Sequence, residues 1–206
     1  MIDLLVDTSL SYIRIALFKD NKLLDFIDEY VDKDLSKLFC VRVKEILVKN
    51  SLSFKDINNI YSVTGPGSFT GIRIGLTFVK VLAFSLNKKV VPISELQILA
   101  STPFNTKYVV PVIDARRGFV FAGVYDIELN SILDDSYINI EDLLNKIDLS
   151  DVTFVSYNDF SFDTVKPNID FIKVYLKNKN RNSVESHFLV PNYLKKTEAE
   201  EKLNAG

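Results

Sequence analysis

The chain repeats one pattern of secondary structure, and this repeat limits the fold more than any other feature. Apolar runs at residues 2–6 and 108–113 each predict a short buried strand, and each run is followed by an aspartate, Asp7 and Asp114. The two aspartates are separated by 114 − 7 = 107 positions, about half of the 206 residues. A second predicted strand follows each aspartate at the same distance. The chain is therefore expected to contain two copies of one unit.

The first copy is the more complete of the two. Its predicted elements, in chain order, are strands at 2–6, 12–18 and 23–30, a helix at 34–50, a strand at 60–64, a helix at 69–86, a strand at 90–92 and a short helix capped by Ser94. The second copy has strands at 108–113, 119–125 and 152–157 and a modest helix at 140–147, and the remainder is poorly periodic. We predict an α/β fold of two subdomains, 1–105 and a reduced 106–206 with a C-terminal tail. Duplicated βββαβα halves with an acidic first turn are typical of the actin, hexokinase and Hsp70 architecture (ASKHA, ribonuclease H-like).

Composition excludes several classes of protein. A net charge of −2 provides no general basic field for nucleic acid, and a single cysteine with a single histidine excludes a disulfide framework and the usual zinc sites. The N-terminus carries no signal-peptide pattern, and Arg73 and Lys80 interrupt the most apolar stretch. A cytoplasmic protein without a membrane span is expected.

The glycine-rich segment GPGSFTG at residues 65–71 has two interpretations. As a Walker loop it lacks the required lysine, and Pro66 removes one amide donor that a phosphate cradle would use. Weak nucleotide binding between the halves stays open, and its candidate contacts are Asp7, Thr8, Ser9, Gly65, Gly67 and Asp114. The alternative for the two aspartates, which we favour, is that each caps its turn by accepting backbone hydrogen bonds.

The helix predicted at 69–86 is apolar almost all round, which one sheet face does not require. Gly71 and Gly75 lie four apart, a spacing that lets another backbone approach closely. We therefore expect an interface with a second subunit, shared with the helix at 34–50, rather than internal packing alone. Leucine at Gly71 or glutamate at Val79 is expected to break that interface and leave the fold intact. The candidate partner-binding residues are Leu38, Val41, Val48, Gly71, Ile72, Gly75, Leu76, Val79 and Leu82.

Four segments resemble the TsaB (YeaZ) family of bacterial tRNA-modification proteins: LLVDTS at 4–9, GPGSFTGIRIGL at 65–76, IDARRGFVFAGVYD at 113–126 and PNYLKKTEAE at 191–200. The resemblance implies an actin-like fold and a role in forming threonylcarbamoyladenosine beside the tRNA anticodon. It implies a non-catalytic subunit without a cofactor of its own, which docks the metal-carrying paralogue TsaD through the first two helices. It also implies a small ATPase partner, TsaE, a competing homodimer, and contact with tRNA only through the complex.

Two other functions are weighed against this resemblance. An ATP-dependent phosphotransferase would use the cleft between the halves and would depend on Asp7. A peptidase would use Ser68 as its nucleophile, but the only histidine, His187, lies in the irregular C-terminal region with no predicted approach to that serine. The pair Arg116–Arg117 is equally well read as an anion contact or as a solvated turn.

Overall fold

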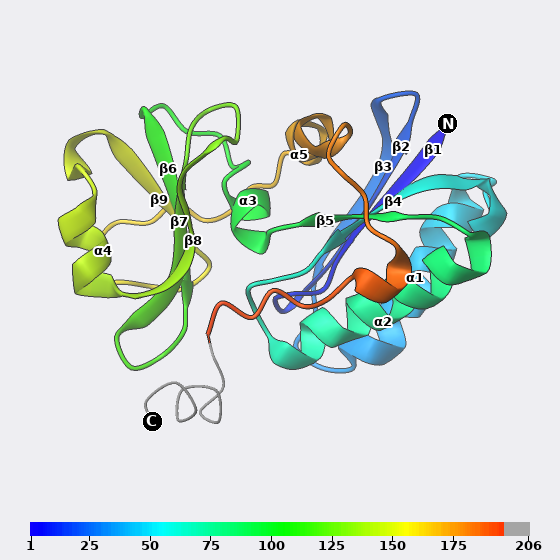
Figure 1. Cartoon of the computed structure of the whole chain (residues 1–206), viewed down its shortest axis with the longest axis horizontal. Coiled ribbons are helices and arrows are strands. Elements are labelled where there is room, and N and C mark those ends of the chain that lie inside the picture. The colour runs from blue at the N-terminus through cyan, green and yellow to red at the C-terminus, as the bar shows by residue number, and fades with distance from the viewer. Residues whose placement is uncertain (196–206) are drawn as a thin grey trace.

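The computed structural model describes residues 1–195 and shows an α/β protein with two β-sheets (Figure 1). The first sheet has the order β3-β2-β1-β4-β5. Its strands are β1 (Ile2–Asp7), β2 (Tyr12–Lys19), β3 (Lys22–Tyr30), β4 (Ile57–Val63) and β5 (Val90–Ile93). Strands β1, β4 and β5 are parallel, whereas β2 and β3 run antiparallel to their neighbours.

The second sheet repeats this topology without the fifth strand. Its order is β8-β7-β6-β9, formed by β6 (Tyr108–Asp114), β7 (Phe119–Tyr125), β8 (Ser131–Asn139) and β9 (Val152–Val155). As in the first sheet, the first three strands are antiparallel and the fourth pairs with the first in parallel. The predicted duplication and the reduction of the second copy are therefore confirmed for residues 1–195.

Helices cover both faces of the first sheet. Helices α1 (Leu35–Lys49) and α2 (Phe69–Leu86) lie side by side on one face, and α3 (Glu95–Leu99) and α5 (Phe171–Asn178) lie on the other (Figure 1). The alternation of strand side chains explains this arrangement. Leu4 and Val6 of β1 belong to the core under α1 and α2, whereas Leu5 belongs to the core under α3 and α5.

Helix boundaries follow local chemistry. The Ser68 side chain accepts a hydrogen bond from the Gly71 amide at 3.2 Å and so caps α2, which ends before Asn87 in the left-handed conformation. Ser94 caps α3 in the same way through the Leu96 amide, as predicted. By length and composition alone α2 could span a membrane, but core helices pass the same weak test, and the inward face of α2 is buried in this chain.

The sequence prediction missed β8 and α5, and it placed Lys177 in a loop although that residue lies in the last turn of α5. After α5 the chain returns to the first half: Val184 pairs with Val90, the short helix η3 (Ser186–Phe188) follows, and the Asn192 amide donates to the Thr64 carbonyl at 2.8 Å. The second predicted subdomain therefore contributes packing to the first sheet. Residues 196–206 of its predicted tail, including the end of the motif at 191–200, lie outside the described residues.

Candidate functional site

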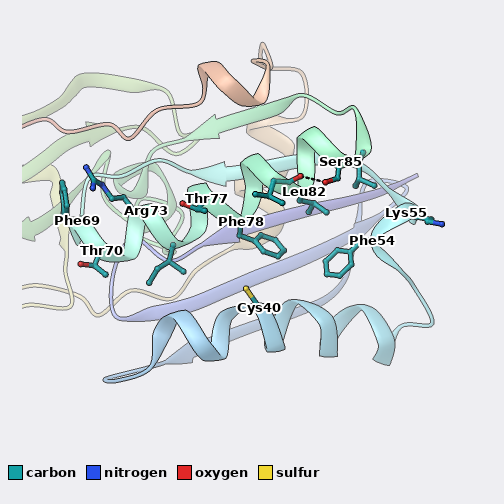
Figure 2. Close-up of a pocket in the computed structure, with 13 residues that line it drawn as sticks. Cys40, Phe54, Lys55, Phe69, Thr70, Arg73, Thr77, Phe78, Leu82 and Ser85 are labelled. Atoms are coloured by element: carbon teal, nitrogen blue, oxygen red, sulfur yellow. Dashed lines mark hydrogen bonds between the residues drawn. The ribbon is translucent and has the colours of Figure 1, made fainter.

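A wide apolar groove, here called the α1–α2 groove, lies between α1 and α2 (Figure 2). Its volume is about 1010 Å³. The residues that line it are Cys40, Phe54, Lys55, Phe69, Thr70, Arg73, Ile74, Thr77, Phe78, Val81, Leu82, Ser85 and Leu86. Most of these belong to α2, which turns one face to the sheet and a second apolar face to the groove.

Aromatic rings form the inner wall of this groove. Phe78 lies edge-on to the buried Phe39 of α1, with ring centroids 5.1 Å apart, and Phe54 approaches it from the far end of the helix pair. Val81 and Phe69 are 62% and 56% exposed, respectively, so nothing in the described part of the chain covers the outer wall. Exposed apolar surface of this extent is typical of a binding face. The predicted open apolar flank is thus present.

The residues predicted to form that flank are only partly correct. Ile72, Leu76 and Val79 are buried against the sheet, and Leu82, at 8% exposure, is the single member of the predicted set that also lines the groove. Leu38 is half-buried, whereas Val41 and Val48 are exposed on α1. The helical face was assigned wrongly because both faces of α2 are apolar. Glutamate at Val79 would charge the core, contrary to the expectation that it leaves the fold intact.

Gly71 and Gly75 serve a contact inside the chain, which corrects the expectation that they admit a second subunit. A Cβ atom on Gly71 would lie 2.2 Å from the carbonyl oxygen of Thr8, and one on Gly75 would lie 2.4 Å from the Thr8 hydroxyl oxygen. That hydroxyl donates to the Gly71 carbonyl at 2.8 Å. The close approach predicted from the glycine spacing is therefore real, but the β1–β2 turn fills it.

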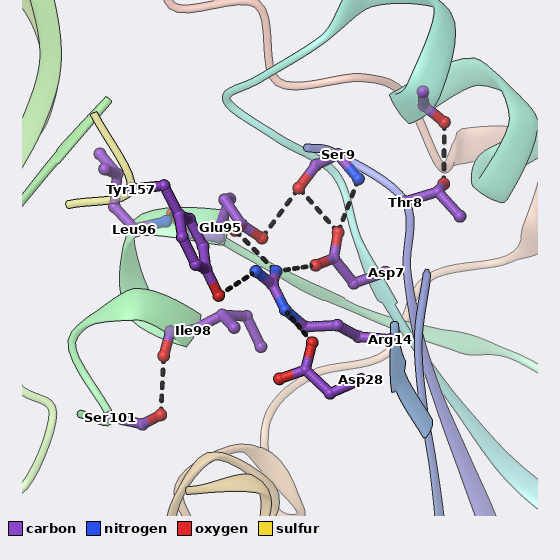
Figure 3. A network of polar contacts seen from close by, with 12 residues as sticks. Asp7, Thr8, Ser9, Arg14, Asp28, Glu95, Leu96, Ile98, Ser101 and Tyr157 are labelled. Atoms are coloured by element: carbon purple, nitrogen blue, oxygen red, sulfur yellow. Dashed lines mark hydrogen bonds and ion pairs between the residues drawn. The ribbon is translucent and has the colours of Figure 1, made fainter. Parts of the chain in front are cut away.

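Below this contact lies a buried polar cluster, formed by Asp7, Ser9, Arg14 and Glu95 (Figure 3). The Arg14 guanidinium contacts Asp7 Oδ2 at 2.5 Å and Glu95 Oε1 at 2.9 Å, and all three side chains are fully buried. Asp7 Oδ1 also accepts from the Ser9 amide at 2.7 Å. Charged side chains this deeply buried persist only when they are paired and hydrogen-bonded.

The cluster holds one cation and two carboxyl groups, so its proton count matters. The Ser9 hydroxyl lies 2.7 Å from Asp7 Oδ1 and 2.8 Å from Glu95 Oε2, but it has one proton to donate. Burial, reinforced by the neighbouring Asp7 charge, raises the pKa of Glu95 well above its ordinary value of 4.5. A neutral Glu95 that donates to Ser9 satisfies every contact and leaves Arg14 balanced by Asp7.

The same cluster joins the two halves of the chain. Arg14 Nη2 donates to the Tyr157 hydroxyl at 3.0 Å, and the Tyr157 ring stacks on Tyr12 with centroids 4.5 Å apart. Sequence reasoning missed Arg14, Glu95 and Tyr157. For Arg14 a signal was available, because it is the one charged residue within the apolar strand Ile13–Phe18.

The candidate nucleotide contacts are mostly occupied by the chain itself. Asp7, Thr8 and Ser9 are buried, and the Ser9 carbonyl accepts from the Ser68 amide at 2.6 Å. Gly67 packs so closely on this turn that an added Cβ would lie 2.2 Å from the Ser9 carbonyl oxygen, and Gly65 is buried. Asp114 is exposed and accepts from the Arg116 amide at 2.8 Å. The turn-capping role that we favoured for both aspartates is confirmed.

The geometry offers little to the two catalytic alternatives. Both oxygens of Asp7 already accept hydrogen bonds from Ser9 and Arg14, which a phosphotransferase site would need to release. Ser68 caps α2, and His187 lies against the Phe188 ring, with no hydrogen bond between Ser68 and His187. Within residues 1–195, no group of three histidine, cysteine or acidic side chains is arranged to hold a metal ion.

Comparisons with known proteins agree with this architecture. The family model described as TsaD, tRNA N6-adenosine threonylcarbamoyltransferase, matches residues 27–184. The chain is 28% identical to the tRNA threonylcarbamoyladenosine biosynthesis protein TsaB of Bacillus subtilis, over 97% of this chain and 96% of that protein. It is 30% identical to Escherichia coli TsaB over 63% of this chain and 57% of that protein.

Solved structures show the same fold. YeaZ from Pseudomonas aeruginosa superposes with a TM-score of 0.80 at 23% identity, covering 94% of this chain and 99% of that one. A second Pseudomonas aeruginosa structure, described as an uncharacterised protein similar to the peptidase YeaZ, gives a TM-score of 0.81 at 22% identity with the same coverage. The actin-like fold class is therefore confirmed. By these likenesses the chain belongs to the family of the tRNA N6-adenosine threonylcarbamoyltransferase TsaD and, within it, to the TsaB (YeaZ) proteins.

Proposed function

We propose that this protein is a non-catalytic subunit of tRNA threonylcarbamoyladenosine biosynthesis, and that it docks a TsaD-like catalytic paralogue through the α1–α2 groove. The names of its relatives support the pathway. The proposal further includes a TsaE-like ATPase as a third component, contact with tRNA only through the complex, and a cytoplasmic location, where tRNA is modified. It assigns no resident cofactor to this chain and leaves room for a nucleotide at the subunit interface.

The observation that carries the docking role is the open groove itself. Specific interfaces bury on the order of 1,600 Å² and centre on well-packed apolar and aromatic side chains. The groove supplies the rings of Phe54, Phe69 and Phe78 on a rigid helix pair. We include the exposed Val41 and Val48 of α1 in the docking face and exclude Ile72, Leu76 and Val79, because those side chains belong to the core of this chain.

The non-catalytic role is supported by how the chain uses its polar side chains. The carboxylates that could serve a reaction are either locked in the buried cluster, as Asp7 is, or cap an exposed turn, as Asp114 does. A catalytic base needs access to its substrate. The groove, which is the most accessible cavity on the first half, is lined mainly by hydrocarbon and aromatic groups.

A matched pair of substitutions tests the docking role. Val81→Glu places a charge on the outer wall of the groove, and Ile127→Glu places the same charge on a similarly exposed residue of the second half, 62% and 58% exposed respectively. Neither side chain belongs to the core, so both variants should fold as the wild type does. We expect Val81→Glu to abolish co-elution with the TsaD protein of the same organism and to stop threonylcarbamoylation in the reconstituted reaction, because a buried unpaired charge costs several kcal/mol.

Ile127→Glu should behave as wild type in both measurements. Co-elution that survives Val81→Glu would refute docking through the groove. Threonylcarbamoylation that proceeds equally well without this chain would refute the role in the pathway.

A further inference from the structure

The charges at the ends of the α1–α2 groove carry a second message. Among the residues that line the groove only Lys55 and Arg73 are charged, and both are positive. Figure 2 shows Arg73 at one end of the groove, near the start of α2, and Lys55 at the other. Between them the wall is apolar or carries only hydroxyl and thiol groups.

Arg73 is held in place before any partner arrives. Its guanidinium lies over the Phe69 ring at 3.8 Å from the centroid, and its Nε donates to the Tyr193 hydroxyl at 3.0 Å. The Tyr193 ring in turn stacks on Phe69, with centroids 5.4 Å apart. These contacts use the face of the guanidinium and one N–H group, and leave its two terminal nitrogens for an incoming acceptor. Pre-ordering of this kind lowers the entropic cost of binding.

Neither cation is neutralised within residues 1–195, because no carboxylate in that part of the chain lies within 4.0 Å of either group. The nearest acid in sequence to Lys55 is Asp56, whose carboxylate accepts from the amide and hydroxyl of Ser53 and does not line the groove. By contrast, Arg42 of α1 is already paired with Glu29 and Glu45.

We infer that the groove is built for a different protein, one that presents an apolar helix with a carboxylate at each end, and that it discriminates against a second copy of this chain. The inference rests on the proposed docking function. Two copies placed groove to groove would bring four cations together with no carboxylate in either lining, and like charges across an interface oppose association. An acidic partner would pair with both cations.

The test compares two equilibria, the heterodimer with the TsaD protein of the same organism and the homodimer, both measured by analytical ultracentrifugation. Lys55→Glu reverses a charge that has no other contact, and Arg73→Gln removes a charge but keeps a polar side chain. We expect each to weaken the heterodimer about tenfold and to leave the homodimer unchanged or tighter. Raising the salt concentration should weaken the wild-type heterodimer and not the homodimer. Lys146→Glu, which makes the same charge change as Lys55→Glu on exposed α4 (Ile140–Lys146), should alter neither.

Three outcomes would overturn the inference. A heterodimer that is insensitive to Lys55→Glu and Arg73→Gln but lost in Val81→Glu would show that docking occurs without charge recognition. A homodimer weakened as much as the heterodimer would remove the discrimination. The chain's own Glu198, Glu200 and Glu201 are the remaining source of carboxylates. If changing all three to glutamine in the full chain abolishes the charge sensitivity, the carboxylates are internal. If Val81→Glu also leaves the heterodimer intact, the proposed docking function fails instead.

Discussion

The two acidic turns of the duplicated fold share their local chemistry and differ in everything around it. In the first turn Asp7 Oδ1 accepts from the Ser9 amide at 2.7 Å, and in the second Asp114 Oδ1 accepts from the Arg116 amide at 2.8 Å. Asp7 is nevertheless 1% exposed and paired with Arg14, whereas Asp114 lies in the open.

The difference arises from distant elements. Helix α2 lies on the first turn through Gly71, and α3 brings Glu95 against Ser9. In the second half α5, the counterpart of α2, packs instead on the first sheet, where Tyr175 stacks on Phe18. A short stretch of sequence thus sets the shape of a turn, and an element more than 60 residues away decides whether that turn becomes a buried cluster or a solvated loop.

The largest expected effect comes from the arginine that separates the two turns. Arg14→Leu leaves the Asp7 carboxylate buried without its cation, and breaking a buried pair in this way costs about 3–5 kcal/mol of unfolding free energy. The matched change Arg116→Leu in the exposed second turn should stay within about 0.5 kcal/mol. Urea denaturation of both variants measures the difference. A cost below about 1 kcal/mol for Arg14→Leu would contradict the pairing described for the first turn.

A smaller effect is expected from the glycines of the two turns. Alanine at Gly71 must displace the Thr8 carbonyl, a backbone atom with little freedom, so overpacking should cost about 2–3 kcal/mol. Alanine at Gly118 meets open space, with its nearest neighbour at 3.9 Å, and costs only the left-handed backbone angle, about 1 kcal/mol. Thermal unfolding of the two variants tests the order, and equal shifts in melting temperature would refute it.

The duplication and most of the elements were readable from the sequence because each depends on nearby residues. The run of apolar residues in β1, the capping by Ser94 and the long apolar helix α2 are local signals. Strand β8 escaped because its residues alternate weakly on a half-exposed edge. Helix α5 has buried residues at 171, 174, 175 and 178, a correct helical pattern, but over only eight residues.

The site was less predictable than the fold, for a physical reason. A helix that is apolar on two sides does not reveal which side meets its own sheet, so Val79 was placed on the surface and Val81 was overlooked. The spacing of Gly71 and Gly75 revealed a close approach and not the identity of the approaching backbone. The buried cluster joins β2, α3 and the segment after β9, and no short-range pattern announces such a meeting.

The smallest expected effect concerns the proton on Glu95 and appears mainly as a dependence on pH. Because burial beside Asp7 raises the pKa of Glu95 above 4.5, the folded state binds a proton there that the unfolded state has released. This contribution to stability is complete below pH 4.5 and is lost as the pH rises through the higher pKa of the folded state. Glu95→Gln cannot ionise and is nearly isosteric with the neutral acid, so below pH 4.5 it should match the wild type within about 1 kcal/mol. Subtracting the two urea-denaturation profiles over pH isolates this group: relative to the variant, the wild type should lose stability as the pH rises. A difference that stays flat would mean that Glu95 has a normal pKa, and a difference of opposite sign would mean that the charged form stabilises the cluster, in which case the second turn differs from the first by two buried ion pairs and not by one.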